Sequence, residues 1–365
     1  MARVTNLAIR LASHRAQYVA LLDNDVIVHP DWLKKLIEVT QANPNIGSYE
    51  SLLLRTGAPG IIDGTGDFID ILGNALSRQS GERLEKLDLL RLDTDIFSAR
   101  SATLIVRRDP FEQLSGLDES FEVILEDVDL GWRIRTASFS TRLVPGSVIP
   151  HAAASTVKTL SKSFVMYQGT KDRVQMLLKN FDFLNLLRYV SMRVLLDLFG
   201  CLLLLMARKP ELSYAIIRGL TWNLTHIPAV LRRRSAVQTQ IRTIRDSRLI
   251  GKHIARKLFS RPTVVWHNLN RPHEEKTVET LTSVRFQADG LAFASTLEWM
   301  QVEQQQRNAH PTKDQCESMN LRDFSRGESQ VQVYSNKCEV ALKRIEGRKV
   351  NSVRGMCRRS SVRLI

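Results

Sequence analysis

The sequence has little cysteine and no paired cysteine motif. Its four cysteines are scattered and form no CxxC pair: Cys201, Cys316, Cys338 and Cys357. This spacing argues against a zinc site and a disulfide framework, and it fits a reducing compartment. The N-terminal residues also lack the apolar segment and cleavage pattern of a secretory signal. We therefore expect a cytoplasmic protein.

The chain also has no excess of acidic residues over basic ones. The chain has 52 Lys and Arg against 38 Asp and Glu, a formal net charge of +14. Such a charge favours an anionic partner, which could be nucleic acid, a membrane surface or a phosphorylated substrate. Because no reader motif or aromatic platform accompanies the basic residues, we expect no nucleic-acid binding. For the basic stretch 232–261, a stripe on anionic lipid and a solvated helix face both remain open.

No hydrophobic run is both long and free of charge. The most apolar stretch, residues 183–207, is interrupted by Arg188, Arg193 and Asp197. Its uninterrupted part is shorter than the roughly 20 residues of a membrane span, which favours an amphipathic or re-entrant segment. We expect residues 156–265 to form a helical, basic, membrane-associated region at the cytoplasmic face of the membrane.

What the sequence does contain first is an alternation of helical and strand patterns over residues 1–155. The apolar run 18–22 has no alternation, which is typical of a strand covered on both faces. The Gly-rich stretch 56–70 reads as loop and turns. The fold class we predict is therefore α/β, with a mixed, mostly parallel sheet flanked by helices. The polar, aperiodic residues 266–365 predict a tail of low order.

Two clusters of acids fall at the ends of these elements. Asp23, Asn24 and Asp25 follow the first strand, where an open α/β sheet binds its ligands. The carboxylates of Asp23 and Asp25 suit a divalent cation, although an Asx turn would explain the same residues.

The second cluster, Glu126, Asp127 and Asp129, opens a helix. The helix dipole favours acids in a first turn and would keep a carboxylate ionised, as a general base for an alcohol requires. His151 follows a predicted strand and could be either a ligand or a structural histidine.

Three stretches in this order resemble the family 2 glycosyltransferases, most closely the rhamnosyltransferase-like branch that builds surface polysaccharide and lipid-linked glycans. They are YVALLDNDVIVHPDWL at 18–33, TLIVRRDPFEQLSGLDESFEVILEDVDLGWRIR at 103–135 and LVPGSVIPHAAAS at 143–155. The resemblance covers about residues 5–155 and implies a GT-A fold.

The resemblance also implies roles for the acids. Asp23, Asn24 and Asp25 would bind a nucleotide-diphosphate sugar, with Asp23 and Asp25 as the DxD-type motif that holds Mn²⁺ or Mg²⁺. His151 matches a position that completes the metal site in some relatives.

By the same resemblance, Asp127 matches the catalytic base and Glu126 its neighbour that helps to position the acceptor. The reaction implied is sugar transfer, with inversion, to a hydroxyl of a glycan or lipid-linked acceptor.

The sequence departs from the family in one respect that bears on function. Relatives normally carry several tens of residues, including a first strand, before the DxD strand, so the resemblance implies an N-terminally incomplete GT-A domain. A second hypothesis follows, in which the chain is a catalytically inactive, membrane-associated remnant or interaction protein.

Overall fold

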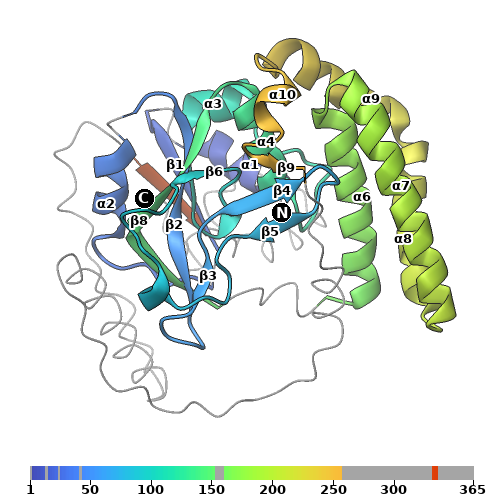
Figure 1. The fold of residues 1–365 in the computed structure, drawn as a ribbon. Coiled ribbons are helices and arrows are strands. Elements are labelled where there is room, and N and C mark those ends of the chain that lie inside the picture. The colour runs from blue at the N-terminus through green and yellow to red at the C-terminus, as the bar shows by residue number, and fades with distance from the viewer. Residues whose placement is uncertain are drawn as a thin grey trace, which may run out of the picture.

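The computed structural model describes residues 2–12, 15–23, 25–40, 43–152 and 160–256, together with the backbone of residues 331–335. A large mixed sheet has helices on both faces, and a bundle of long helices lies to one side of it (Figure 1). The predicted α/β class with a sheet flanked by helices is confirmed.

The large sheet has the strand order β10-β1-β7-β2-β8-β6, with β3 paired to β2. Its strands are β10 (Val331–Ser335), β1 (Tyr18–Leu22), β7 (Leu104–Arg107), β2 (Ile46–Arg55), β8 (Ser140–His151), β6 (Asp95–Ile96) and β3 (Ile62–Gly64). A small sheet has the order β5-β4-β9, formed by β5 (Ala75–Ser77), β4 (Asp67–Asp70) and β9 (Ile254–Ala255).

The helices fall into two groups. Those around the sheet are α1 (Ala2–Leu11), α2 (Trp32–Thr40), α3 (Arg108–Gln113) and α4 (Glu126–Thr136). Those after it are α6 (Lys162–Asn180), α7 (Phe183–Met206), α8 (Pro210–Thr225), α9 (Ile227–Ala236) and α10 (Asp246–Leu249). Short helical turns complete the described chain: η1 (Leu84–Lys86), η2 (Ser101–Thr103) and η3 (Val237–Ile241).

Two details of the prediction were wrong. The sheet is mixed but not mostly parallel, because β7 runs antiparallel to both of its neighbours, β1 and β2, and β3 and β6 also pair antiparallel. An apolar run reports burial on two faces but not the direction of a strand. The stretch 56–70 is not only loop, since it contains β3 and β4, whose glycines hid the strand pattern.

The side chains of β1 explain its unbroken apolar pattern. Val19 and Leu21 pack into the cluster beneath α1, α3 and α4, whereas Tyr18, Ala20 and Leu22 pack with α2 on the opposite face. Every residue of the strand is buried, as the sequence predicts. Helices on both faces of the sheet therefore hold β1, and with it the acids that follow the strand, in place.

Helix α6 ties the helical group to α4. Lys179 Nζ lies 2.6 Å from Asp118 and 2.8 Å from Asp129, and Asn180 donates a hydrogen bond to the other oxygen of Asp129 at 2.8 Å. Phe181 packs edge-on against Trp132 of α4, with ring centroids 4.8 Å apart. Asp129 thus has a structural role, and the helix that it belongs to is held firmly in place.

The predicted division at residues 155 and 265 stays a prediction. Within the predicted tail 266–365, the structure describes the strand β10, whose backbone pairs parallel with β1. The remainder of that tail lies outside the described residues.

Candidate active site

Three segments meet at one edge of the large sheet. Strand β1 arrives with its carboxyl end, and the antiparallel β7 brings its amino end beside it, so that the Asp23 N–H donates to the Ala102 carbonyl at 3.2 Å. Strand β8 ends at His151, and the following Ala152 N–H donates to the Asp25 carbonyl at 3.0 Å. Because β7 runs antiparallel to β1, the turn η2 that precedes β7 lies next to Asp23.

Asp23, Asp25 and His151 form a group with the donor atoms of a cation site. One ligand atom from each residue lies within 4.8 Å of the others. The Nε2 atom of His151 is 3.5 Å from Asp25 Oδ1. Two carboxylates and one imidazole fit a divalent cation, with further positions left for a substrate oxygen or water. The sequence prediction grouped these three residues, and the structure brings them together; Asn24 lies outside the described residues.

Asp63, on β3, was missed by the sequence prediction. Its Oδ2 lies 2.9 Å from His151 Nδ1. Burial opposes ionisation of Asp63, but the hydrogen bond with His151 and the charges of Arg100 and Arg55 outweigh it and hold the pKa below its ordinary value. An ionised carboxylate only accepts, so His151 Nδ1 donates in this hydrogen bond, and Nε2 is the ring nitrogen that faces Asp25.

Arg100 links Asp63 to the interior of the sheet and was missed as well. Its guanidinium lies 3.3 Å from Glu50 on β2 and 3.3 Å from Asp63, and it also faces Asp67 at 3.9 Å. Burial raises the pKa of Glu50 to about 8, against the opposing charge of Arg100. The close spacing also requires Gly64, because a Cβ there would lie 1.9 Å from the Arg100 guanidinium. The only sequence signal was a set of acids on either side of two glycines in residues 62–70.

Asp127, in the first turn of α4, faces the same edge. Its Oδ2 accepts the Ser101 N–H of η2 at 3.0 Å, and its Oδ1 accepts the Val128 N–H at 2.8 Å. The residue before the pair of acids, Leu125, has a φ of 67°, a conformation that is rare for a bulky side chain. Such strain concentrates at functional sites.

The neighbouring Glu126 is placed differently. It is 2% exposed, whereas Asp127 is only half-buried. Burial, helped by the charge of Asp127, raises the pKa of Glu126 well above its ordinary value. Asp127 is therefore the acid that a substrate can reach. The predicted role of Glu126 in positioning the acceptor stays a prediction.

The electrostatics of the site favour cation binding. Burial raises the pKa of Asp23 to about 6, and the charge of Asp25 adds to the rise. Burial also raises the pKa of Asp127, although its two backbone donors reduce the rise. These carboxylates resist ionisation chiefly because they are buried, and the positive charge of a bound cation would favour their ionised form. A carboxylate with a raised pKa also accepts a proton more readily, as a general base must.

Comparison with known sequences finds a family model that matches the first part of the chain. Residues 1–114 match the family model described as glycosyl transferase family 2, which confirms the resemblance over that part of the chain. Uncharacterized protein y4gI of Sinorhizobium fredii is 27% identical over 147 residues, which are 39% of this chain and 16% of the relative. O-antigen biosynthesis protein RfbC of Myxococcus xanthus is 30% identical over 141 residues, 36% of this chain and 10% of the relative. The match thus spans a small part of each relative.

Two solved structures are similar to the chain at 15% sequence identity and a TM-score of 0.33. A mannosyltransferase from Pyrobaculum calidifontis in complex with GDP-Man and Mn²⁺ aligns over 66% of this chain and 63% of its own. GalNAc-T7 with UDP, GalNAc and Mn²⁺ aligns over 41% of this chain and 30% of its own.

Proposed function

We propose, from the premise that residues 1–114 match glycosyl transferase family 2, that the protein is a metal-dependent inverting glycosyltransferase. It moves a sugar from a nucleotide-diphosphate sugar to a hydroxyl group. The single observation that carries the proposal is the meeting of Asp23, Asp25 and His151 at the sheet edge, with Asp127 facing the same edge.

The metal site would hold Mn²⁺ or Mg²⁺ through Asp23, Asp25 and His151. A cation bound there supplies positive charge to the diphosphate that leaves. The chain's own contribution is orientation. Asp63 holds the His151 ring by its Nδ1, and β1 and β8 fix the two carboxylates, so the donor atoms need little rearrangement to bind.

Asp127 would act on the acceptor. Its carboxylate takes the proton from the acceptor hydroxyl as that oxygen bonds to the anomeric carbon. The bond from the anomeric carbon to the diphosphate oxygen breaks, and its electron pair leaves with the nucleotide diphosphate. Attack from the side opposite the leaving group inverts the anomeric centre. Ser101 and Val128 hold both oxygens of Asp127, which orients the base without neutralising it.

The acceptor would be a glycan or a lipid-linked glycan at the cytoplasmic face of a membrane. The feature that supports a membrane location is α7, which among the described helices is long and apolar enough to cross a bilayer, yet is only 22% buried over its most apolar window. Peripheral contact through this helix would hold the sheet edge near a lipid-linked substrate.

Calorimetric titration with UDP and dTDP, each with and without Mn²⁺, tests the proposal. We expect binding that requires Mn²⁺ and is lost in Asp25→Asn. The matched control is Asp109→Asn on α3, where the side chain is 89% exposed and its substitution should leave binding unchanged.

A folded protein that binds neither nucleotide with Mn²⁺ would contradict this function. It would favour the second hypothesis, an inactive membrane-associated remnant or interaction protein. Folding of each variant is checked by circular dichroism and thermal melting.

A further inference from the structure

Helix α7 is amphipathic, but its apolar side faces solvent instead of the protein. Its outward arc carries large apolar side chains that are more than half exposed: Phe183, Leu184, Leu187, Leu195, Phe199, Leu202, Leu205 and Met206. Leu195, near the middle of the helix, is 68% exposed. Exposed apolar side chains scattered singly are ordinary, but a continuous row along one helix marks a surface that something else covers.

Two charged residues of α7, Arg193 and Asp197, face the protein. Arg193 and Asp197 form an ion pair on the inner face, with Arg193 Nε 2.9 Å from Asp197 Oδ2, and Arg193 also donates to Asn74 at 3.1 Å. Asn74 belongs to the turn between β4 and β5, and it is held in turn by Asp70. Further along, Ser213 of α8 donates to the Cys201 carbonyl at 3.2 Å. The helix is therefore fastened to the rest of the protein along its length.

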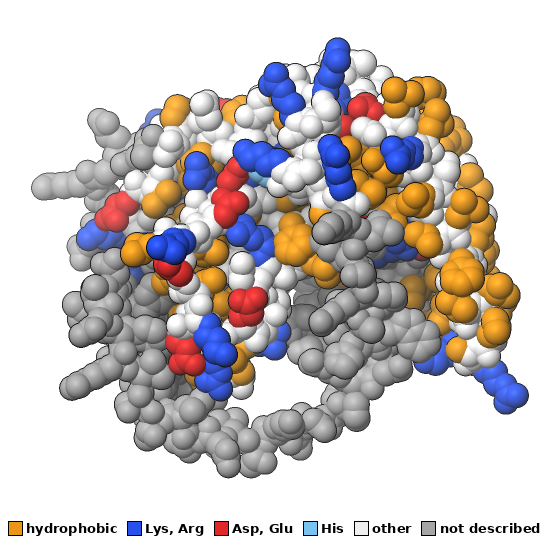
Figure 2. Space-filling view, viewed as in Figure 1, with side chains coloured by type: hydrophobic (Ala, Val, Ile, Leu, Met, Phe, Trp, Pro, Cys, Tyr) orange, Lys and Arg blue, Asp and Glu red, His pale blue; other side chains and the backbone are white. Residues whose placement is uncertain are grey.

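The apolar surface continues beyond α7. On α8 and α9 the exposed large apolar side chains are Tyr214, Ile217, Leu224, Ile227 and Leu231. Figure 2 shows hydrophobic side chains gathered along the side of the molecule that these helices occupy in Figure 1. We name this surface, from Phe183 to Leu231 on α7, α8 and α9, the outer apolar face.

The exposed basic residues of α7, α8 and α9, and of the turn that joins α7 to α8, are named the border of the outer apolar face. Residues 183–234 include Arg188, Arg193, Arg208, Lys209, Arg218 and Arg232–Arg234, against the acids Asp197 and Glu211. Arg193 pairs with Asp197 on the inner face, and Arg234 donates to the carbonyls of Leu178 and Phe181. The exposed basic residues are Arg188, Arg208, Arg218 and Arg232, so the border that solvent can reach is positive.

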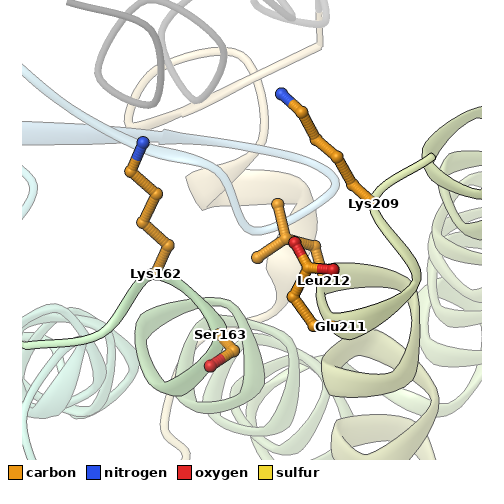
Figure 3. A pocket seen from close by; sticks show the side chains of 5 residues that line it. All are labelled: Lys162, Ser163, Lys209, Glu211 and Leu212. Atoms are coloured by element: carbon orange, nitrogen blue, oxygen red, sulfur yellow. The ribbon is translucent and has the colours of Figure 1, made fainter. Parts of the chain in front are cut away.

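The positive border extends to a pocket beside the C-terminal end of α7. It has a volume of about 300 Å³ and is lined by Lys162, Ser163, Lys209, Glu211 and Leu212. In Figure 3 the side chains of Lys162 and Lys209 extend to the same side of this pocket. Glu211 is the one acidic side chain in the lining.

We propose that the outer apolar face seats on an anionic lipid bilayer with α7 lying in the plane of the membrane, so that the helix anchors the protein without crossing the bilayer. The charge of the border selects lipid over a second copy, because two copies joined through this face would oppose basic border to basic border. An in-plane helix sinks its apolar side about 5–10 Å into the interface, while Lys and Arg stay with the headgroups.

The contacts that hold α7 to the protein favour a helix in the plane of the membrane over a helix that crosses it. A helix that crosses the bilayer alone has lipid on every side, whereas the inner face of α7 carries the Arg193–Asp197 pair and its bond to Asn74. Pulling α7 into hydrocarbon would break that contact with the domain that carries the sheet edge. This inference deepens the membrane contact proposed above, and its test does not require that the protein transfer sugar.

Vesicle sedimentation of the full chain tests the proposal, with POPC alone and with POPC containing POPG. We expect binding to the anionic vesicles, weakened by salt. The triple variant Leu195→Gln/Phe199→Gln/Leu202→Gln should lose binding, and each of Arg188→Gln and Arg232→Gln should weaken it about fivefold, since a basic residue near the surface is worth about 1 kcal/mol. Leu90→Gln, at a side chain that is 90% exposed on the other part of the molecule, is the matched control and should bind as the parent does.

Spin labels then distinguish the two modes of insertion. Labels at positions 187, 195 and 202, in a background without native cysteines, should lie at nearly equal depths in the bilayer. A span would separate the first and last by about 22 Å, at 1.5 Å per residue. Either unequal depths of that size, or a parent that ignores anionic vesicles, would overturn the proposal. So would a parent dimer that the triple variant converts to monomer while vesicle binding is unchanged.

Discussion

The sheet edge and helix α7 place their charged side chains in opposite ways. At the sheet edge, carboxylates lie close together where a substrate can approach, and their pKa values rise chiefly because they are buried, with the charge of Asp25 adding to the rise at Asp23. On α7 the charged pair Arg193–Asp197 faces inward and leucines face outward. The first arrangement is unfavourable until a cation arrives, and the second until an apolar medium arrives. The sheet edge is therefore suited to bind a cation, and the outward side of α7 is suited to contact an apolar medium.

The largest effect that we predict from this comparison is the loss of transfer rate when Asp127 is substituted, because Asp127 takes the proton in the proposed reaction. Asp127→Asn keeps the shape of the side chain, but its single oxygen can accept only one of the two N–H groups, that of Ser101 or that of Val128, and it cannot take a proton. We expect the transfer rate to fall about 10²–10⁴-fold, the usual contribution of a general base. The rate of nucleotide diphosphate release from nucleotide sugars, with membrane lipids as acceptors, measures it. Full turnover in the variant would exclude Asp127 as the base.

The next effect concerns the orientation of His151. Asp63→Ala removes the acceptor at Nδ1, and Mn²⁺ affinity should fall about 10–100-fold, as is usual when the partner of a ligating histidine is lost. Arg55→Gln removes another contact of Asp63 without touching the ring, and it should change the affinity far less. Electron paramagnetic resonance of free Mn²⁺ gives both affinities. Equal losses in the two variants would assign Asp63 a structural role only.

A pH titration sharpens the electrostatic side of the comparison. The pKa of Asp23 is raised to about 6, and the cation must displace its proton. Mn²⁺ affinity should therefore be full above pH 6 and fall about tenfold for each unit below it. In Asp23→Asn this part of the pH dependence should vanish along with much of the affinity. A parent whose affinity stays flat from pH 7 to pH 5 would contradict the raised pKa.

The smallest effects separate the two faces of α7. Asp197→Ala leaves the Arg193 charge without its carboxylate and should lower the free energy of unfolding by about 2–3 kcal/mol. Leu198→Gln, at the next residue but on the exposed side, should change it by about 0.5 kcal/mol or less. Urea unfolding without lipid measures both. The reverse order of the two costs would mean that α7 is not oriented as described.

Local patterns were enough to predict the elements that carry Asp23, Asp25, Asp127 and His151. Strand β1 was predicted with its exact bounds, 18–22, and α4 begins at Glu126 as predicted, because an apolar run and acids in a first turn are local signals. The order of three stretches then supplied the family. These residues lie at element ends, so a prediction of the elements also predicted where their side chains gather.

Asp63 and Arg100 could not be found in this way. Asp63 acquires its role only when β3 pairs with β2 and brings it beside His151, and Arg100 only when β7 runs antiparallel. Strand direction and pairing are set by contacts between segments far apart in sequence, which apolar periodicity does not encode. The outward leucines of α7 were visible in composition, but the side on which Arg193 and Asp197 lie required the structure.

The central claim is that two carboxylates and one imidazole at the sheet edge hold a single cation. Pulsed electron paramagnetic resonance of the chain loaded with one equivalent of Mn²⁺ tests it most directly, because an imidazole ligand couples its nitrogen to the electron spin. We predict one bound Mn²⁺ with nitrogen coupling that disappears in His151→Gln, and tighter binding when UDP is added. Mn²⁺ bound with no nitrogen coupling, or with coupling that survives the loss of His151, would contradict the account.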